Sequence, residues 1–253
     1  MGRRVTSLLM GCLGLALLWP CASGAAAAQG AQDLPTEQIE RIVREYLLRE
    51  PEVIYEALQE LQRRQAAHAE AQQKQALADN RSLLYDRSED PVGGDPDGDV
   101  TLVEFFDYRC TYCRRVVDSI RELVEQKSNL RLVFKELPVL GPDSVRASRA
   151  ALASRHQDGY VPFHFALMAS TDLSPEGIRA TAISVGLDPD QLEQDMDEPE
   201  VQATIEQNYR LASALGIEGT PAFVVGDQLV PGAVSRERLD ELIEEARTGC
   251  LSC

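Results

Sequence analysis

Cysteine is scarce in this chain. Six of its 253 residues are cysteines, too few for a small secreted scaffold in which several disulfides replace a hydrophobic core. Four of the six nevertheless form two C-x-x-C pairs. The first pair is Cys110 and Cys113, and the second is Cys250 and Cys253. Two such pairs need an explanation other than structural cross-linking.

Positive charge is also in short supply. The chain has 25 Lys and Arg residues against 41 Asp and Glu residues, which gives a formal net charge of −16. Because an acidic surface repels nucleic acids and anionic membranes, a nucleic-acid partner is excluded. The hydrophobic share of 44% is ordinary for a globular protein, so the length is sufficient for one sizeable domain and a smaller part.

Histidine is rarer still, and the three histidines His68, His156 and His164 are scattered along the chain. None stands at the spacing from a cysteine or from another histidine that structural metal sites use. His156 and His164 fall in a region of predicted helices, where surface or packing positions are expected. The sequence therefore predicts neither a metal site nor a cofactor.

No apolar run reaches the ~20 residues of a membrane-spanning helix. The best candidate, residues 8–19, is interrupted by two glycines, preceded by two arginines and followed by Ala26-Ala27-Ala28. This order predicts a signal peptide over residues 1–28, cleaved before Gln29, and export to the periplasm. An uncleaved anchor is the alternative. Cleavage would remove two arginines and no acid, which moves the formal charge from −16 to −18.

Two helices with an unpaired apolar stripe are predicted within residues 36–80. Pro35 and Thr36 signal the start of the first, and Pro51 suits the first turn of the second. The stripe consists of Ile39, Ile42, Val43, Tyr46, Leu47, Val53, Ile54, Ala57, Leu58 and Leu61. Such helices cannot bury this face alone, so contact with further copies of the chain is expected, as a dimer or trimer. Packing back on the chain's own main domain is the alternative.

The main domain is predicted to be α/β. Strand-like apolar runs at 100–106 and 130–135 flank a helical pattern, and residues 142–216 form a block of helices. A hairpin turning at Gly226-Asp227 and a last helix capped by Ser235 follow. The expected parts are a signal peptide (1–28), a helical oligomerisation segment (33–80), a linker (81–99), the main domain (100–248, with a helical insertion at about 142–216) and a Cys-containing tail (249–253).

The first C-x-x-C pair follows a predicted strand and opens a predicted helix. At that place the free amides and the dipole of the helix stabilise a thiolate, most of all on the first cysteine. Cys110 is therefore the candidate nucleophile and Cys113 the resolving thiol of a dithiol–disulfide cycle. Half of a zinc site and a static disulfide are the alternatives.

Two charged residues interrupt the predicted strands. Glu104 and Lys135 lie in otherwise apolar runs, where an unpaired charge would be costly. We therefore expect the two side chains to pair with each other. The alternative is that both reach solvent at the strand ends.

Two motifs resemble those of the DsbA family of thioredoxin-fold proteins, over roughly residues 95–248. They are Glu104-Phe105-Phe106-Asp107-Tyr108-x-Cys110-x-Tyr112-Cys113 and Gly219-Thr220-Pro221-Ala222-Phe223. Residues 36–80 are similar to the N-terminal helical region of the ScsC-like branch, through Ile42-Val43-Arg44-Glu45-Tyr46-Leu47-Leu48 and Pro51-Glu52-Val53. The resemblance implies a thioredoxin fold with an inserted helical block, preceded by a helical oligomerisation segment.

The resemblance also implies roles for three further residues. Pro221 would be a cis-proline facing the cysteine pair, and Thr220 would offer main-chain hydrogen bonds to an extended client peptide. Glu104 would lie near the resolving cysteine and accept its proton. A trans-proline in an ordinary turn is the alternative for Pro221.

The leading function is that of an exported thiol–disulfide oxidoreductase. Its partners would be unfolded or misoxidised exported proteins and a membrane redox partner. Thr111-Tyr112 between the cysteines differs from the Pro-His of the strongly oxidising prototype, so oxidation, reduction and isomerisation all stay open. The alternatives are a carrier that binds copper or zinc through the Cys pairs and a holdase chaperone. For Cys250 and Cys253 we expect a local disulfide or a flexible tail, with a shuttle or copper-binding role as the alternative.

Overall fold

The computed structural model describes residues 35–126 and 129–249. The predicted signal peptide with its cleavage site and the second cysteine pair lie outside these residues. Within them, no helix has both the length and the apolar character needed to cross a membrane. The chain divides into two compact units between Leu58 and Gln59.

The first unit is helical. Helix α1 covers Thr36–Arg49, and helix α2 covers Glu52–Asp79 and continues into the second unit. The two helices are separated at Glu50, which has φ −126° and ψ 65°, because a residue before proline avoids the helical conformation. No residue of α1 is buried in the chain. Its apolar stripe is therefore exposed, as Ile42 (50% exposed) and Leu48 (73% exposed) illustrate.

The second unit is built on a mixed five-stranded sheet in the order β1-β3-β2-β4-β5. The strands are β1 (Val92–Gly94), β2 (Val100–Phe106), β3 (Leu130–Glu136), β4 (Ala222–Val225) and β5 (Gln228–Pro231). Strands β2 and β3 are parallel and joined through helix α4 (Thr111–Gln126), while the other neighbours pair antiparallel. The predicted strand–helix–strand unit and the hairpin are both confirmed.

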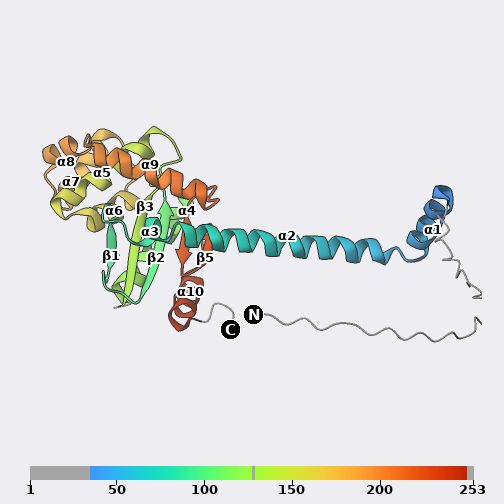
Figure 1. Cartoon of the computed structure of the whole chain (residues 1–253). Coiled ribbons are helices and arrows are strands. Elements are labelled where there is room, and N and C mark those ends of the chain that lie inside the picture. Colours follow the sequence, from blue (N-terminus) through green and yellow to red (C-terminus); the bar gives the residue numbers. More distant parts are fainter. Residues whose placement is uncertain (1–34, 127–128, 250–253) are drawn as a thin grey trace, which may run out of the picture. The chain divides into compact units, whose positions relative to one another are not determined.

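Residues 142–214 form the helical insertion between β3 and β4. Its elements are α5 (Pro142–Ala153), the 3₁₀ helix η1 (Ser154–Gln157), α6 (Tyr160–Ala169), α7 (Pro175–Ser184), α8 (Pro189–Asp195) and α9 (Pro199–Ala214). Four of these helices begin with proline. Proline suits the first turn because an N–H at that position would have no acceptor within the helix. Much of the insertion lies beyond one end of the strands, and α10 (Arg236–Thr248) lies at the other end (Figure 1).

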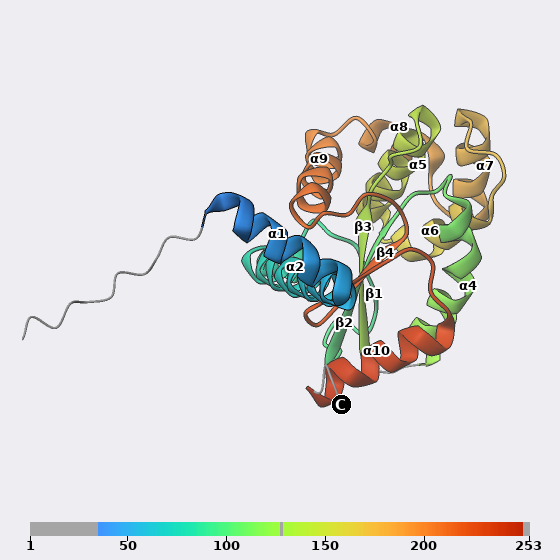
Figure 2. The same ribbon diagram turned by 90° about the vertical axis from the view of Figure 1, so that its right-hand side faces the viewer.

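Alternating side chains of the central strands enter two separate cores. Leu102 and Phe106 of β2 pack with α4 and α6, whereas Val103 and Phe105 face the opposite side. That second core is closed by Leu77 of α2, by Leu84 of helix α3 (Arg81–Tyr85) and by the end of α9. Helices α4 and α6 and helix α9 lie on opposite sides of the sheet (Figure 2).

The predicted pairing of Glu104 with Lys135 is wrong. In the β2–β3 register Lys135 lies opposite Phe105, so its side chain enters the second core while Glu104 points into the first. Lys135 instead pairs with the carboxylate of Asp90 and donates a hydrogen bond to the Leu83 carbonyl at 2.5 Å. Both members of the Lys135–Asp90 pair are buried.

Residues 81–99, expected to be a linker, contain two elements of the fold. Helix α3 packs on the sheet, and β1 pairs with β3 at its edge. The turn-rich composition hides β1, because two of its three residues are glycines. A Cβ at Gly93 would stand 3.0 Å from the Phe134 ring, so glycine permits the close approach of β1 to β3.

Candidate active site around Cys110 and Cys113

Cys110 caps the N-terminus of α4. Its carbonyl accepts the first hydrogen bond of the helix from the Arg114 N–H at 3.1 Å, and its Sγ accepts from the Cys113 N–H at 3.3 Å. A side chain that accepts from the third residue of a helix is the usual N-cap arrangement. The sulfur therefore lies where helix amides favour negative charge.

The Cys110 thiol also faces the loop that leads into β4. It donates a hydrogen bond to the Thr220 carbonyl at 3.2 Å. The Thr220–Pro221 peptide bond is cis, the isomer that the resemblance implies. Residues 110 positions apart in sequence thus meet at one sulfur.

The two cysteines differ in their surroundings. Both are free thiols; Cys110 is 5% exposed and Cys113 is fully buried. Burial raises the pKa of the Cys113 thiol, and the nearby Glu104 carboxylate and Cys110 sulfur raise it further. Burial also raises the pKa of Glu104 to about 8. Glu104 is therefore close enough to Cys113 for its charge to act on that thiol.

Asp107 fixes the turn between β2 and α4. Its Oδ1 accepts from the Arg109 N–H and from the Ser144 hydroxyl, both at 2.7 Å, and its Oδ2 accepts from the Leu140 N–H at 2.9 Å. These bonds join the cysteine motif to the loop after β3 and to the start of α5. Asp107 is in the motif that carries the family resemblance, but its role in fixing this turn was not predicted from the sequence.

A second buried carboxyl lies beside this turn. Glu136, at the end of β3, accepts hydrogen bonds from the hydroxyls of Tyr108 (3.0 Å), Tyr160 (2.7 Å) and Ser148 (2.7 Å). These hydroxyls favour its ionised form, but burial outweighs them and raises its pKa to about 8. His164 lies 3.1 Å from the Tyr108 hydroxyl, and burial lowers its pKa to about 3. His164 is thus a packing residue, as expected.

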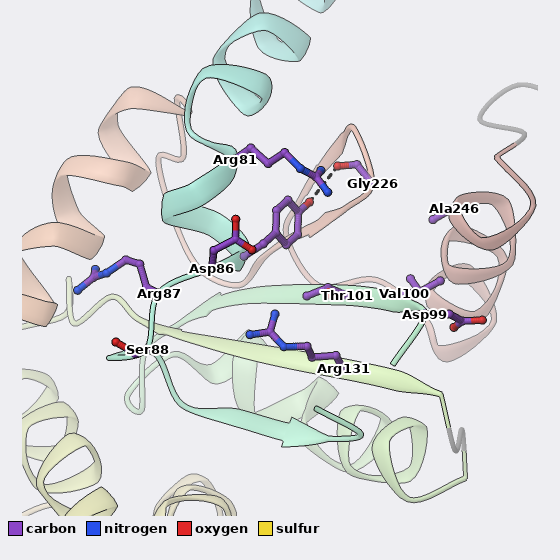
Figure 3. Close-up of a pocket in the computed structure, with 11 residues that line it drawn as sticks. Arg81, Asp86, Arg87, Ser88, Asp99, Val100, Thr101, Arg131, Gly226 and Ala246 are labelled. Atoms are coloured by element: carbon purple, nitrogen blue, oxygen red, sulfur yellow. Dashed lines mark hydrogen bonds between the residues drawn. The ribbon is translucent and has the colours of Figure 1, made fainter. Parts of the chain in front are cut away.

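A separate pocket of about 720 Å³ lies beside α3 and the β4–β5 turn (Figure 3). Its wall includes Arg81, Arg87 and Arg131 together with Asp86 and Asp99. None of the residues expected at the dithiol site lines it. The mixture of charges defines no ligand, and we assign it no role.

A dithiol at a helix N-terminus, beside a cis-proline loop on a mixed sheet, defines a thiol–disulfide oxidoreductase of the thioredoxin type. Residues 101–244 match the DSBA-like thioredoxin domain, and the chain belongs to this family. Residues 36–68 match the N-terminal domain of the copper resistance protein ScsC. These matches confirm the thioredoxin fold, the DsbA family and the ScsC-like N-terminal region that the sequence motifs predict.

Solved structures and curated proteins add to this assignment. A thioredoxin-like oxidoreductase from Silicibacter pomeroyi DSS-3 is 48% identical, with a TM-score of 0.65 over 67% of this chain and 98% of that one. A linker-deletion mutant of Proteus mirabilis ScsC is 29% identical, with a TM-score of 0.66 over 89% of this chain and 99% of that one. The Na(+)/H(+) antiporter NhaA of Herminiimonas arsenicoxydans is 30% identical over 162 residues, 63% of this chain and 26% of that protein. The chain thus spans about a quarter of the length of the antiporter relatives it matches.

Proposed function

We propose that this chain is a periplasmic thiol–disulfide oxidoreductase that exchanges or isomerises disulfides in exported proteins. The observation that carries the proposal is the position of the Cys110 sulfur. It accepts the Cys113 N–H at the start of α4 and faces the Thr220 carbonyl at 3.2 Å. A sulfur held there lies at the positive end of the helix dipole and beside backbone with which an extended client peptide would pair.

The reaction begins when the Cys110 thiolate attacks one sulfur of a client disulfide. A Cys110–client S–S bond forms, the client's own S–S bond breaks, and the released client thiolate takes up a proton. A second client thiolate can then attack this mixed disulfide and release Cys110, which reshuffles the client with no net change of oxidation state. Attack by Cys113 instead forms the Cys110–Cys113 disulfide and leaves the client reduced by two electrons.

Glu104 is the proposed proton acceptor for Cys113. A buried thiol with a raised pKa must lose its proton before it can attack the mixed disulfide. The carboxyl of Glu104, whose pKa of about 8 is far above that of an exposed glutamate, acts electrostatically on that thiol. A base of this strength takes up a proton more readily than an ordinary carboxylate.

Thr220 and Pro221 form the proposed client edge. The Thr220 carbonyl is held at the attacking sulfur, and the Pro221 carbonyl is already engaged by the Gly232 N–H at 2.8 Å. An extended client segment passing Cys110 would therefore pair with the main chain at Thr220, which suits many client sequences because it needs no particular side chain.

The helices at 36–80 are proposed to assemble a homodimer or homotrimer. Ile39, Val43, Leu47 and Leu48 line an apolar groove on α1, and the described residues of the first unit, 35–58, include no buried residue that could form a core against them. Several dithiols in one assembly would favour reshuffling over simple oxidation. The signal-peptide pattern of residues 1–28 supports the periplasmic location, and a membrane protein is the proposed redox partner.

The test is a pair of assays on one preparation, insulin reduction and refolding of scrambled ribonuclease, with the redox potential measured in parallel. Cys110→Ser should lose both activities. A deletion of residues 29–58 is preferable to a longer one, because Leu77 and Leu84 belong to the core of the second unit. This deletion should lower the mass to that of a monomer and reduce isomerisation while insulin reduction persists. Unchanged mass and isomerisation would refute the assembly proposal.

A further inference from the structure

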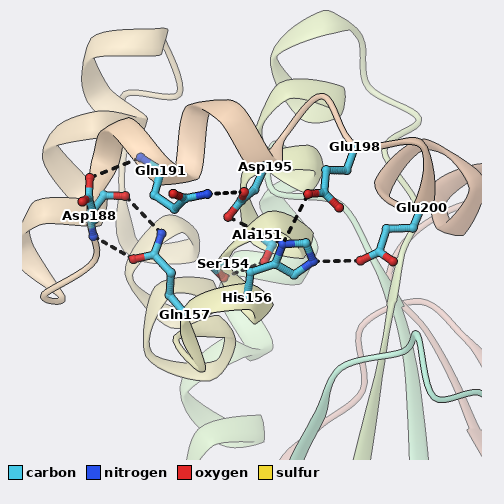
Figure 4. Close-up of polar contacts among 9 residues, drawn as sticks. All are labelled: Ala151, Ser154, His156, Gln157, Asp188, Gln191, Asp195, Glu198 and Glu200. Carbon is cyan, nitrogen blue, oxygen red and sulfur yellow. Dashed lines mark hydrogen bonds and ion pairs between the residues drawn. The ribbon is translucent and has the colours of Figure 1, made fainter.

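One histidine and three carboxylates meet in the helical insertion, apart from every residue of the dithiol site (Figure 4). His156 lies in η1, Asp195 is the last residue of α8, and Glu198 and Glu200 flank the start of α9. Three separate segments therefore converge on one imidazole.

The two ring nitrogens of His156 have different partners. Nε2 lies 2.8 Å from Glu200 Oε1, which is hydrogen-bond distance. Nδ1 lies 3.6 Å from Asp195 Oδ2 and 3.9 Å from Glu198 Oε1, which is too long for hydrogen bonds. One ligand atom from each of His156, Asp195 and Glu198 lies within 4.8 Å of the others.

Asp195 supplies the independent observation that points to a ligand. The residue is only 4% exposed, and its Oδ1 accepts a hydrogen bond from Gln191 Nε2 at 2.6 Å. Its Oδ2 is buried without any hydrogen-bond donor and faces the imidazole. Burying a carboxylate oxygen without a hydrogen-bond donor costs desolvation free energy. A positively charged partner at Oδ2 would offset this cost.

Among the described residues, no arginine or lysine side chain supplies this positive charge. In the part of the chain that the structure describes, neither residue type forms an ion pair with Asp195, Glu198 or Glu200. Arg149, which reaches the corner between α8 and α9, is held by Asp197 at 2.6 Å and by the Met196 carbonyl at 2.7 Å. The acidic corner is therefore open to a cation from solvent.

We propose that His156, Asp195 and Glu198 bind a divalent transition-metal ion, with Zn²⁺ as the expected occupant. Zinc accepts imidazole nitrogen and carboxylate oxygen at about 2.0–2.2 Å, so tetrahedral ligands stand roughly 3.3–3.5 Å apart. The separations of 3.6 and 3.9 Å around Nδ1 need to close by only a few tenths of an ångström. A set of one nitrogen and two oxygens does not suit Cu(I), which prefers sulfur.

Glu200 completes the arrangement as a positioning residue. When the Nε2–H of His156 donates to Glu200, the Nδ1 lone pair faces Asp195 Oδ2, and a cation between them satisfies both. A carboxylate behind a metal-binding histidine fixes the tautomer and the orientation of the ring. Half-exposed Glu198 and partly exposed His156 leave the ion a route from solvent.

The bound ion would join η1 to the corner between α8 and α9. Nearby contacts involve other parts of these elements: Arg149 of α5 binds Met196 and Asp197, and Gln157 of η1 binds Asp188 at the start of α8. Because an ion that binds only the folded chain adds to its stability, zinc should raise the melting temperature. The inference does not rest on the redox function, since none of its residues contacts the dithiol.

The test is calorimetric titration of Zn²⁺ into the signal-free chain with all four of its cysteines replaced by serine, so that no thiolate competes. We expect one ion per chain and a higher melting temperature with zinc. His156→Ala should abolish both effects, and Glu200→Ala should weaken binding by roughly 10–100-fold. Glu176→Gln, an exposed carboxylate of α7 outside the cluster, is the matched control and should change nothing.

Two results would overturn the proposal. One is the absence of zinc binding, which would leave His156 as the centre of an ion-pair cluster that binds a proton only. The other is binding that survives His156→Ala with its affinity unchanged. If His156→Ala fails to fold by circular dichroism, Glu198→Gln on the surface provides the same comparison and should weaken zinc binding at least tenfold. The protein with four serines has no thiol exchange, so zinc binding is measured independently of the proposed redox function. Failure of one proposal therefore leaves the other standing.

Discussion

The thiol of Cys110 lies 3.2 Å from the carbonyl oxygen of Thr220 and donates a hydrogen bond to it. This contact joins the start of α4 to the loop before β4 across the helical insertion. When Cys110 ionises, the S–H donor is lost and the Thr220 carbonyl becomes free to accept from a client N–H. Activation of the sulfur and opening of the client edge would thus be one event.

The resolving step should depend on pH through Glu104. Its carboxyl, with a pKa raised to about 8, accepts a proton only after ionising, so attack by Cys113 should accelerate as the pH rises through about 8. Glu104→Gln should slow this step and remove the rise near pH 8, while attack by Cys110 on a model disulfide is unchanged. The rate at which Cys113 resolves the mixed disulfide can be measured by stopped-flow over a range of pH. An unaltered pH profile in the variant would exclude Glu104 from proton transfer.

Two buried carboxyls should make the fold less stable as the pH rises. Burial raises the pKa of Glu104 and of Glu136 from 4.5 to about 8. Between these values the folded chain holds protons that the unfolded chain has lost, so the free energy of unfolding falls from about pH 4.5 towards 8.

Glu104→Gln should flatten that dependence and stabilise the reduced protein at pH 7 by on the order of 1–3 kcal/mol. Urea unfolding at pH 5 and pH 7.5 is the measurement, and the exposed Glu176→Gln is the control. Equal pH slopes for the wild type and Glu104→Gln would show that Glu104 is already ionised in the fold.

The buried Lys135–Asp90 pair should be a strong stability determinant. Asp90→Ala leaves a buried ammonium without its partner and should cost about 3–5 kcal/mol, whereas Asp90→Ala with Lys135→Met should recover much of the loss. Chemical denaturation of the single and double variants measures this coupling. Lys135→Met and Glu104→Gln should be additive within about 0.5 kcal/mol, since they lie on opposite faces of the sheet. Strong coupling between those two would contradict the register.

The stripe on α1 should control assembly. Ile42→Glu places a charge on the exposed apolar face and should shift the protein towards monomer, with isomerisation lost and insulin reduction retained. Arg41→Gln lowers the charge of the same helix by the same one unit on the face away from the stripe and is the matched control. Light scattering gives the mass. An Ile42→Glu protein with the mass of the wild type would remove this face from the interface.

Much of the dithiol site was predictable from the sequence because its parts are local. Cys110, Cys113 and the helix that follows them lie within one short segment, and periodicity alone placed that helix after a strand. The cis bond before Pro221 was anticipated only through family resemblance, since spacing cannot show which loop returns to the sulfur.

The errors came from contacts that depend on register and on distant segments. Glu104 and Lys135 appeared equivalent in two apolar strands, but a sheet sends neighbouring positions to opposite faces, and the register could not be known beforehand. His156 and Asp195 are 39 residues apart, so no motif spacing linked them. Glu136 was overlooked because its three hydroxyl partners come from the β2–α4 turn, α5 and α6, which are far apart in sequence.

The most direct measurement is the trapping of a mixed disulfide. Cys113→Ser, with Cys250 and Cys253 also replaced by serine, is incubated with a peptide disulfide, and tryptic fragments are analysed by mass spectrometry without reduction. We predict a stable adduct on Cys110, together with its absence when Cys110 is also serine. Failure of Cys110 to form an adduct under conditions in which the wild type reduces insulin would contradict its role as the attacking sulfur.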